Sequence, residues 1–104
     1  MARAKKENQL EIALEDVELI MGTDYRHFNT ILQNVFCSTC PEHMTTIINY
    51  KIYLNNLEDI QLKGQCKTCG GPVGRYIETG ESQDKAEMAR HIREVIKKYS
   101  RMKK

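Results

Sequence analysis

Apolar residues recur three or four positions apart in two stretches near the start of the chain. The first stretch comprises Leu10, Ala13, Leu14, Val17, Ile20 and Met21, and the second comprises Phe28, Ile31, Leu32, Val35 and Phe36. This spacing lines one face of a helix, so each stretch predicts an amphipathic helix. Gly22 suits the end of a helix, and Thr23 or Asp24 can cap the next one. We therefore expect a helical hairpin over residues 8–36, after a basic, flexible N-terminal segment at residues 1–7.

Residues 45–54 alternate between two faces, as is typical of a strand. One face carries only apolar or aromatic side chains, namely Ile48, Tyr50, Ile52 and Leu54. Asn55 and Asn56 give a turn signal, and residues 60–65 predict a second strand that returns along the first. A third short strand is expected at residues 73–79.

Residues 80–104 predict a basic amphipathic helix, which Ser82 can cap and which runs over residues 83–101. Its apolar positions form a heptad seam of Met88, Ile92, Val95, Tyr99 and Met102. Two heptads are too few for a stable isolated coiled coil, so this helix should dock on another surface. The first predicted helix has the same apolar spacing and carries acidic residues. We hypothesise that the two terminal helices pack together, within one chain or between two.

All four cysteines belong to two Cys-x-x-Cys pairs, which are separated by 25 residues. The pairs are Cys37 with Cys40 and Cys66 with Cys69. Each pair offers two thiolates from one tight turn, and zinc takes four such ligands in a tetrahedron. We therefore predict one zinc ion held by the four sulfurs. Thiols that are free to bind metal indicate a reducing compartment, so we expect a cytoplasmic protein; two disulfides in a secreted scaffold are the alternative.

The two cysteine pairs and the segment between them resemble a zinc ribbon domain. The resemblance is carried by Cys37-Ser-Thr-Cys40, by the predicted hairpin, and by Gln65-Cys66-Lys-Thr-Cys69-Gly-Gly-Pro. It implies three antiparallel strands over residues 37–79 with zinc between two knuckles, and a binding role in transcription, translation or transposition. The expected fold is then α+β: a three-stranded antiparallel zinc ribbon flanked by an N-terminal helical hairpin and a C-terminal amphipathic helix.

Other proteins with paired cysteines fit this sequence less well. Rubredoxins bind iron between similar knuckles, but Pro41 stands where a glycine is expected after the first pair. A thioredoxin-like redox centre needs a βαβ pattern around a cysteine pair, and neither pair has one. His43 lies three residues beyond Cys40 and could replace a cysteine as a metal ligand. We interpret it instead as a solvated turn residue.

The candidate chemistry favours binding over catalysis. Four thiolates leave zinc no open position for water, and no nucleophile with a base, pair of carboxylates or phosphate loop is visible in the sequence. We therefore expect no enzyme and no small-molecule substrate. No apolar run approaches the roughly 20 residues of a membrane span, so no membrane partner is expected either.

Charge is segregated along the chain, although the formal net charge is only +2. Residues 7–24 carry six acids and no base, whereas residues 80–104 carry eight bases and four acids. Zinc bound to four thiolates adds about −2, so the loaded protein is near neutral. The first helical segment is therefore acidic and the end of the chain is basic.

Basic and aromatic residues outside the metal site indicate nucleic-acid binding. Lys63, Lys67, Arg75 and Tyr76 lie on the predicted ribbon, where cations can pair with phosphates and a ring can stack on bases. The last helix adds Arg90, Arg93, Lys97, Lys98, Arg101, Lys103 and Lys104. A helix-turn-helix role for residues 8–36 is disfavoured, because an acidic first helix repels phosphate.

Two functions remain open at this point. The first is a non-catalytic module that binds DNA or RNA, as a regulator or an accessory subunit of a nucleic-acid machine. The second is a protein-interaction or assembly factor that pairs through its terminal helices, with a second copy or with another protein.

Overall fold

The computed structural model describes the backbone of residues 9–102 and the side chains of residues 9–99. The expected basic N-terminal segment, residues 1–7, lies outside the described residues. In chain order the elements are β1 (Leu10–Ile12), α1 (Leu14–Met21), the 3₁₀ helix η2 (Gly22–His27), α2 (Phe28–Leu32), β2 (Val35–Phe36), β3 (Met44–Thr45), β4 (Ile47–Leu54), β5 (Ile60–Cys66), β6 (Pro72–Ile77), the 3₁₀ helix η3 (Thr79–Glu81) and α3 (Gln83–Met102). These helices and antiparallel sheets confirm the α+β class.

The main sheet has four strands in the order β1-β4-β5-β6, and not the three expected for the ribbon. The additional strand is β1, in a segment for which the apolar spacing predicted a helix. Leu10 pairs with Leu54, and Ile12 pairs with Ile52. Leu10 and Ile12 are two positions apart, so they can also share one face of a strand. The helix begins only at Leu14, where the Asp16 carboxylate accepts a hydrogen bond from the Ala13 amide at 2.9 Å.

The predicted helical hairpin is only partly correct. Gly22, with φ of 60°, ends α1, and the chain continues through η2 into an α2 of five residues. The second apolar stripe leaves the helix after Leu32, and Val35 becomes part of β2 instead. Val35 is fully buried and pairs with Thr45 of β3, so tertiary pairing outweighs the helical spacing at this position.

The β4–β5 hairpin contains a bulge that the sequence did not reveal. The register shifts between Ile48 and Lys51, where Asn49 has a positive φ of 50°. As a result Ile47, and not Ile48, shares the core face with Ile52 and Leu54. The predicted alternation is therefore correct only for the part of β4 that follows the bulge.

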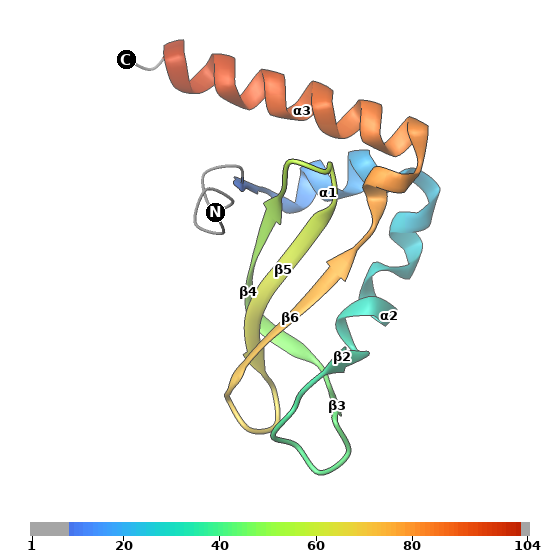
Figure 1. Ribbon diagram of the computed structural model, residues 1–104, viewed down its shortest axis with the longest axis vertical. Coiled ribbons are helices and arrows are strands. Elements are labelled where there is room, and N and C mark those ends of the chain that lie inside the picture. The colour runs from blue at the N-terminus through green and yellow to red at the C-terminus, as the bar shows by residue number, and fades with distance from the viewer. Residues whose placement is uncertain (1–8, 103–104) are drawn as a thin grey trace.

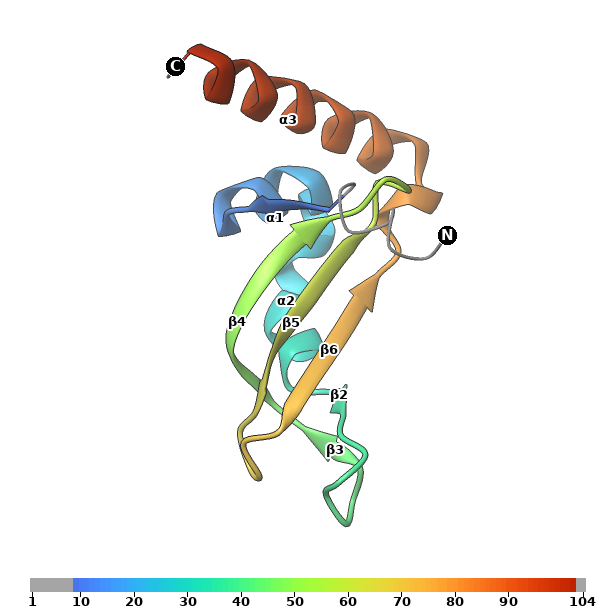
Figure 2. The same ribbon diagram turned by 60° about the vertical axis from the view of Figure 1, so that its left-hand side comes forward.

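The sheet and the helices form two layers. Buried residues of β4 and β5, with Leu54, Ile60 and Leu62 fully inaccessible, pack in one core with Val17 of α1 and Phe28 of α2. Figure 2 shows α2 behind β5 and β6, with no helix over the opposite face of these strands. We call this opposite side of the main sheet the open face.

The two terminal helices pack against each other within one chain, which confirms one form of the hypothesis made from the sequence. Helix α3 lies across the end of the sheet beside α1, while the cysteine-bearing loops lie at the other end of the molecule (Figure 1). Ala89 and Ile92 of α3 are buried, and Lys85 pairs with Asp24 at 2.9 Å. Val95 of the predicted seam remains half exposed. None of the helices in the described part of the chain has both the length and the apolar composition that a membrane crossing needs.

Candidate metal centre and the open face

The two cysteine pairs meet at the end of the molecule opposite α3. Cys37 and Cys40 lie in the loop between β2 and β3, whereas Cys66 is the last residue of β5 and Cys69 follows in the turn to β6. The long β4–β5 hairpin brings the second pair back to the first, because β4 starts beside the first knuckle and Ile47 pairs with Cys66.

The four sulfur atoms form one cluster that fits a zinc ion. All four Sγ atoms lie within 4.8 Å of one another, and none forms a disulfide. The Cys37 and Cys69 sulfurs are 3.6 Å apart, and those of Cys40 and Cys66 are 3.5 Å apart. Zinc–sulfur bonds of about 2.3 Å in a tetrahedron set sulfurs about 3.8 Å apart, close to the observed distances. The donor set and its spacing are therefore consistent with zinc, and the predicted metal ligands are brought together.

Backbone amides of the second knuckle point at its sulfurs. The amides of Thr68 and Cys69 each donate to Cys66 Sγ at 3.3 Å, and the Gly71 amide donates to Cys69 Sγ at 3.4 Å. The turn passes through Gly70 with φ of 81°, a conformation that residues with a Cβ rarely adopt. These donors stabilise negative charge on the sulfurs, as a metal-binding thiolate requires.

Two threonine hydroxyls add contacts that sequence reasoning missed. Thr39 Oγ1 lies 3.3 Å from Cys37 Sγ and 3.1 Å from Cys69 Sγ, so it joins the two knuckles. Thr45 Oγ1 lies 3.1 Å from Cys66 Sγ on the buried side of the cluster. The position of Thr39 between the two cysteines of the first pair is visible in the sequence. The contact of Thr45 with Cys66 depends on the fold.

The four cysteines differ in burial, and the buried neighbours Cys40 and Cys66 differ in acidity. Cys37, Cys40 and Cys66 are buried, and Cys69 is exposed. Burial acts to raise the pKa of Cys66, but contacts with the Thr45 hydroxyl and nearby amides outweigh it and lower the pKa to about 5. The neighbouring Cys66 sulfur raises the pKa of Cys40 to about 12. Cys66 therefore loses its proton more readily than Cys40. A bound dication would displace the protons that remain on the other thiols.

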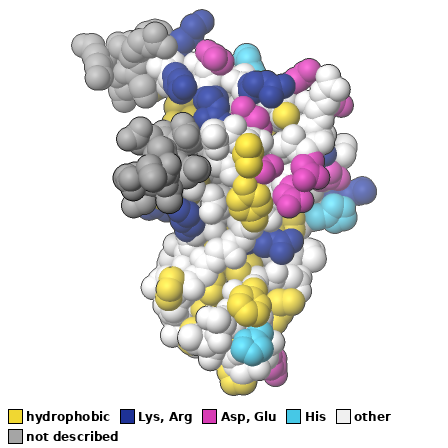
Figure 3. Space-filling view, in the orientation of Figure 1, with side chains coloured by type: hydrophobic (Ala, Val, Ile, Leu, Met, Phe, Trp, Pro, Cys, Tyr) yellow, Lys and Arg dark blue, Asp and Glu magenta, His cyan; other side chains and the backbone are white. Residues whose placement is uncertain are grey.

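His43 is positioned by the loop and does not join the sulfur cluster. Its Nδ1 lies 3.1 Å from the Cys37 carbonyl oxygen, and its ring stacks on Phe36 with centroids 5.6 Å apart. Phe36 is 64% exposed, and its partner in the β2–β3 pair, Met44, is 54% exposed. Figure 3 shows hydrophobic and histidine side chains together at this end of the molecule.

The open face carries two rows of side chains that cross three strands. Tyr53, Gln61 and Tyr76 are paired across β4, β5 and β6, and we call them the tyrosine row. Lys51, Lys63 and Gly74 are paired in the same way, and we call them the lysine row. The structure therefore brings the predicted residues Lys63 and Tyr76 to one face, and adds Lys51 and Tyr53. The alternation along β4 puts Lys51 and Tyr53 on one face of that strand, but only the pairing of β4 with β5 brings them beside Lys63.

The other ribbon candidates lie at the margins of this face. Arg75 pairs with Leu62 and so belongs to the opposite side of β6, although its side chain is exposed at the sheet edge. Lys67 is exposed in the second knuckle. A surface hollow of about 470 Å³ lies over β5 and β6, with Lys63, Gly74 and Tyr76 among its lining residues.

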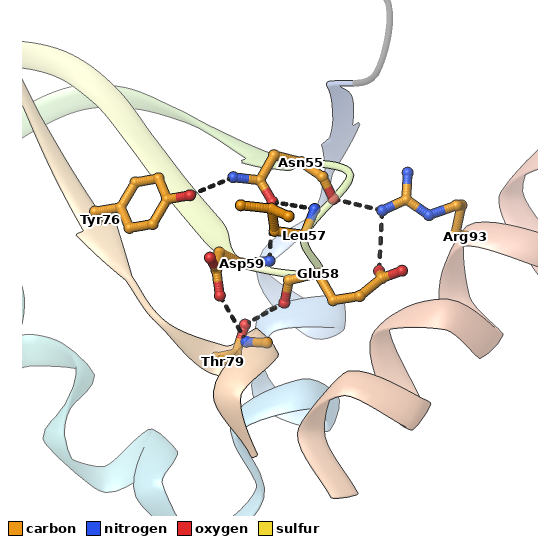
Figure 4. Close-up of polar contacts among 8 residues, drawn as sticks. Asn55, Leu57, Glu58, Asp59, Tyr76, Thr79 and Arg93 are labelled. Atoms are coloured by element: carbon orange, nitrogen blue, oxygen red, sulfur yellow. Dashed lines mark hydrogen bonds and ion pairs between the residues drawn. The ribbon is translucent and has the colours of Figure 1, made fainter. Parts of the chain in front are cut away.

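Arg93 of α3, a predicted nucleic-acid contact, is engaged inside the protein. Its Nη2 pairs with the Glu58 carboxylate at 2.9 Å and donates to the carbonyl oxygen of Asn55. Only 15% of its side chain is exposed. Thr79 donates to the Glu58 carbonyl oxygen, so this network ties the β4–β5 turn to both η3 and α3 (Figure 4).

The remaining basic residues of α3 do not form a continuous cationic surface. Arg90, Lys97 and Lys98 are exposed. Glu87 and Glu94 are also exposed, and they alternate with Arg90 and Lys97 along one side of the helix. The side chains of Arg101, Lys103 and Lys104 lie outside the described residues.

Comparison of the chain with known protein families, with characterised protein sequences and with solved structures finds no match.

Proposed function

We propose that this chain is a non-catalytic, zinc-stabilised module that binds nucleic acid through the open face of its main sheet. The observation that carries the proposal is the lysine row, in which Lys51 and Lys63 are direct neighbours in register and both exposed. Two like charges placed side by side are mutually unfavourable and are compensated by a bound anion. Such a module would act as a regulator or an accessory subunit of a nucleic-acid machine, in the reducing, cytoplasmic setting that four free thiols favour.

The charge distribution around the sheet favours the lysine row, while the exposed Glu11 of β1 pairs with Tyr53 and adds one negative charge to the same face. Asp24, Glu78 and Glu81 line a hollow of about 450 Å³ between η2 and the junction of β6 with α3, on the helical side of the molecule. Figure 3 shows acidic side chains gathered on the right-hand side of that view. Lys85 pairs with Asp24 in this hollow, but within the described residues neither Glu78 nor Glu81 forms a salt bridge. These two carboxylates repel phosphates, which are attracted instead to the lysine row and to Lys67 at its margin.

The zinc centre has a structural role in this proposal. All four candidate ligands are thiolates, and a closed tetrathiolate site has no position for water or substrate. Its task is to hold the β2–β3 pair and the start of β6 against the end of the hairpin. When bound, the metal supplies the attraction that keeps four thiolates together.

The test is binding of the zinc-loaded chain to labelled nucleic acid, measured by fluorescence anisotropy over a range of salt concentrations. We expect affinity to fall as salt rises, since each phosphate contact releases counterions. The double variant Lys51→Gln with Lys63→Gln should weaken binding and reduce this salt dependence. The matched control, Arg90→Gln with Lys97→Gln, removes the same charge from α3 and should have little effect. If the α3 variant alone weakens binding, the assignment to the open face is wrong.

Protein docking is a second candidate function, favoured by Phe36 and Met44. Large apolar side chains that lie together and exposed often mark an interaction surface. The double variant Phe36→Ser with Met44→Ser should then abolish any concentration-dependent association seen by analytical ultracentrifugation. A chain that stays monomeric and captures no partner through this end would leave nucleic-acid binding as the proposed function.

A further inference from the structure

We propose that the open face is a stacking platform for single-stranded nucleic acid, on which Tyr53 and Tyr76 stack on bases and the lysine row pairs with phosphates. This inference rests on the proposed function and names its substrate class. The register that sets these residues side by side cannot be read from the sequence.

The two tyrosines are spaced to stack on two bases of one strand that are not adjacent. They occupy the outer positions of one row across β4, β5 and β6, with Gln61 between them. Neighbouring strands are about 4.8 Å apart, so the two ring-bearing positions are separated by roughly 10 Å. Sheets that bind single strands stack two or three bases on aromatic side chains of the exposed face. The lysine row lies two residues further along each strand, about 7 Å away, where the backbone of the same strand can pass.

Tyr76 is held in place before any ligand binds, whereas Lys63 lies over the ring of Tyr53. The Tyr76 hydroxyl accepts a hydrogen bond from the Asn55 side-chain amide at 2.6 Å, while 42% of the residue is exposed. The ammonium of Lys63 lies 5.3 Å from the centre of the Tyr53 ring. A ring with a fixed orientation loses little conformational entropy when a base stacks on it. Tyr76 is therefore preorganised for stacking, and Tyr53 becomes available on that face when Lys63 turns to pair with a phosphate.

The hollow beside Tyr76 offers room for a flat group, while Gln61 and Gln9 occupy the space between the rings. Gly74 completes the lysine row without a side chain, and the hollow over β5 and β6 lies beside it. Lys63 donates to the Gln9 side-chain oxygen at 3.2 Å, and Gln9 in turn donates to Gln61 at 2.8 Å. The Lys63 contact is exposed to solvent, so a phosphate can replace the Gln9 oxygen at small net cost.

A duplex fits this surface poorly. Its bases are stacked on each other, and their faces are not available to side-chain rings. The major groove admits a helix or a two-stranded ribbon, whereas the open face presents three adjacent strands of a broader sheet. Single-stranded DNA and single-stranded RNA share the chemistry that the platform recognises, namely exposed base faces and a charged backbone.

The experiment compares three probes on the zinc-loaded full chain. They are labelled oligothymidylate and oligouridylate of about 15 nucleotides, and a mixed-sequence duplex of the same length. We expect both single strands to bind more tightly than the duplex. Tyr53→Leu and Tyr76→Leu should each weaken single-strand binding by about fivefold or more, since each removes a stacking ring. Tyr53→Phe keeps the ring and is the matched control, which should stay within about twofold of the unmodified chain. Tyr76→Phe keeps the ring but loses the hydrogen bond from Asn55, so its loss of affinity should be smaller than that of Tyr76→Leu.

A direct reporter covers the case in which a leucine variant fails to fold. The chain contains no Trp, so the variant Tyr76→Trp places a single indole in the tyrosine row. Its fluorescence should be quenched when oligothymidylate saturates the protein, because a base stacks on the indole. Saturation without quenching would overturn the stacking platform.

The outcomes separate this inference from the proposed function. If the duplex binds as tightly as the single strands and the leucine variants bind normally, the platform is wrong and nucleic-acid binding by the lysine row stands. If none of the three probes binds, both proposals are wrong. If single strands are preferred and the ring is required, both are supported, and the relative affinity of the thymidylate and uridylate probes identifies DNA or RNA as the preferred strand.

Discussion

Thr39 and Thr45 contact opposite sides of the candidate metal centre and should contribute differently to it. The Thr45 hydroxyl is buried, 3.1 Å from Cys66 Sγ, and becomes a donor to that sulfur once the thiol loses its proton. Thr39 lies on the exposed side, within 3.3 Å of the sulfurs of both Cys37 and Cys69. Groups that orient metal ligands in this way typically change metal affinity by about 10- to 100-fold when removed.

We predict that Thr45→Val weakens zinc binding by about 10- to 100-fold, whereas Thr39→Val mainly increases the reactivity of Cys69. Valine keeps the shape of threonine and removes only the hydroxyl. Competition with a chromogenic chelator measures the affinity, and mass spectrometry after treatment with iodoacetamide identifies the first cysteine to be alkylated. Equal zinc affinity in Thr45→Val and the unmodified chain would show that the buried hydroxyl does not support the ligand.

Gly64 is a residue whose lack of a side chain the fold requires. A Cβ at this position would lie 2.6 Å from the Ile48 carbonyl oxygen and 2.8 Å from Tyr50 Cα, at the bulge in the neighbouring strand. The Ile48 carbonyl oxygen and Tyr50 Cα both belong to the backbone, so neither can move aside without shifting the strand. The cost of such overpacking is typically about 1–3 kcal/mol.

Gly64→Ala is therefore expected to reduce the free energy of unfolding by about 1–3 kcal/mol, measured by denaturant titration of the zinc-loaded protein. Gly71→Ala is the matched control, because the nearest atom to its Cβ is at 3.4 Å, an ordinary contact distance. The control should change the free energy by no more than about 0.5 kcal/mol. Similar values for the two variants would mean that β4 adapts freely at its bulge.

At the scale of the elements, the sequence predicted the metal ligands and the long strands better than the short elements. The Cys-x-x-Cys spacing is a local property, so Cys37, Cys40, Cys66 and Cys69 could be found without the fold. Leu10 and Ile12 suit a helix face and a strand face equally, and only the pairing of β1 with β4 decides between them. The short strand of Val35 and Phe36 was missed for the same reason, since its partner Thr45 lies ten positions away in the sequence.

The turn between β4 and β5 holds α3 across the end of the sheet, and Arg93 makes the connection. Glu58 is 14% exposed at its side chain and has Arg93 as its charged partner. Asn55 also accepts hydrogen bonds on its side-chain oxygen from the amides of Leu57 and Asp59, which fixes the turn that receives Arg93 (Figure 4). Loss of the guanidinium would leave a largely buried carboxylate without its charged partner, while the Asn55 carbonyl oxygen would keep the Glu58 amide as a donor.

We predict that Arg93→Ala lowers the free energy of unfolding by about 1–3 kcal/mol, the usual cost of leaving a buried acceptor unsatisfied. Arg90→Ala removes the same side chain from an exposed position one turn earlier and should change stability by about 0.5 kcal/mol or less. Thermal unfolding of the zinc-loaded variants provides the comparison. A larger effect at Arg90 than at Arg93 would contradict the role of the β4–β5 turn as the attachment site of α3.

At the scale of the whole molecule, the arrangement of surfaces was the least predictable feature. Sequence spacing indicated a basic last helix, but the structure places Arg93 inside and mixes glutamates among the exposed bases of α3. The lysine and tyrosine rows arise from register across three strands, which depends on the bulge in β4 and on the turns between the strands as well as on the hydrophobic pattern. A face that binds a partner therefore emerges only once the strands are paired.

The molecule also has two separate centres of stability, and removal of the metal should affect them unequally. The apolar core joins α1, α2, α3 and the β4–β5 hairpin, whereas the other buried cluster consists of cysteines with Val73 packed against it. Few apolar contacts hold the knuckles, so their order depends on the metal. The core carries Leu54, Ile60 and Leu62 at zero exposure and does not contain a metal ligand.

We predict that a chelator raises hydrogen exchange at the metal end first, as measured by mass spectrometry of peptides. The amide of His43, bonded to the Cys40 carbonyl oxygen, and the amide of Cys66, bonded to Gly71, should lose protection. Amides around Leu62 of β5 and Ala89 of α3 should keep it, because their protection comes from the apolar core. Simultaneous loss of protection at both ends would mean that the metal supports the whole fold cooperatively, and unchanged exchange at His43 and Cys66 would mean that the four cysteines do not hold the structural ion.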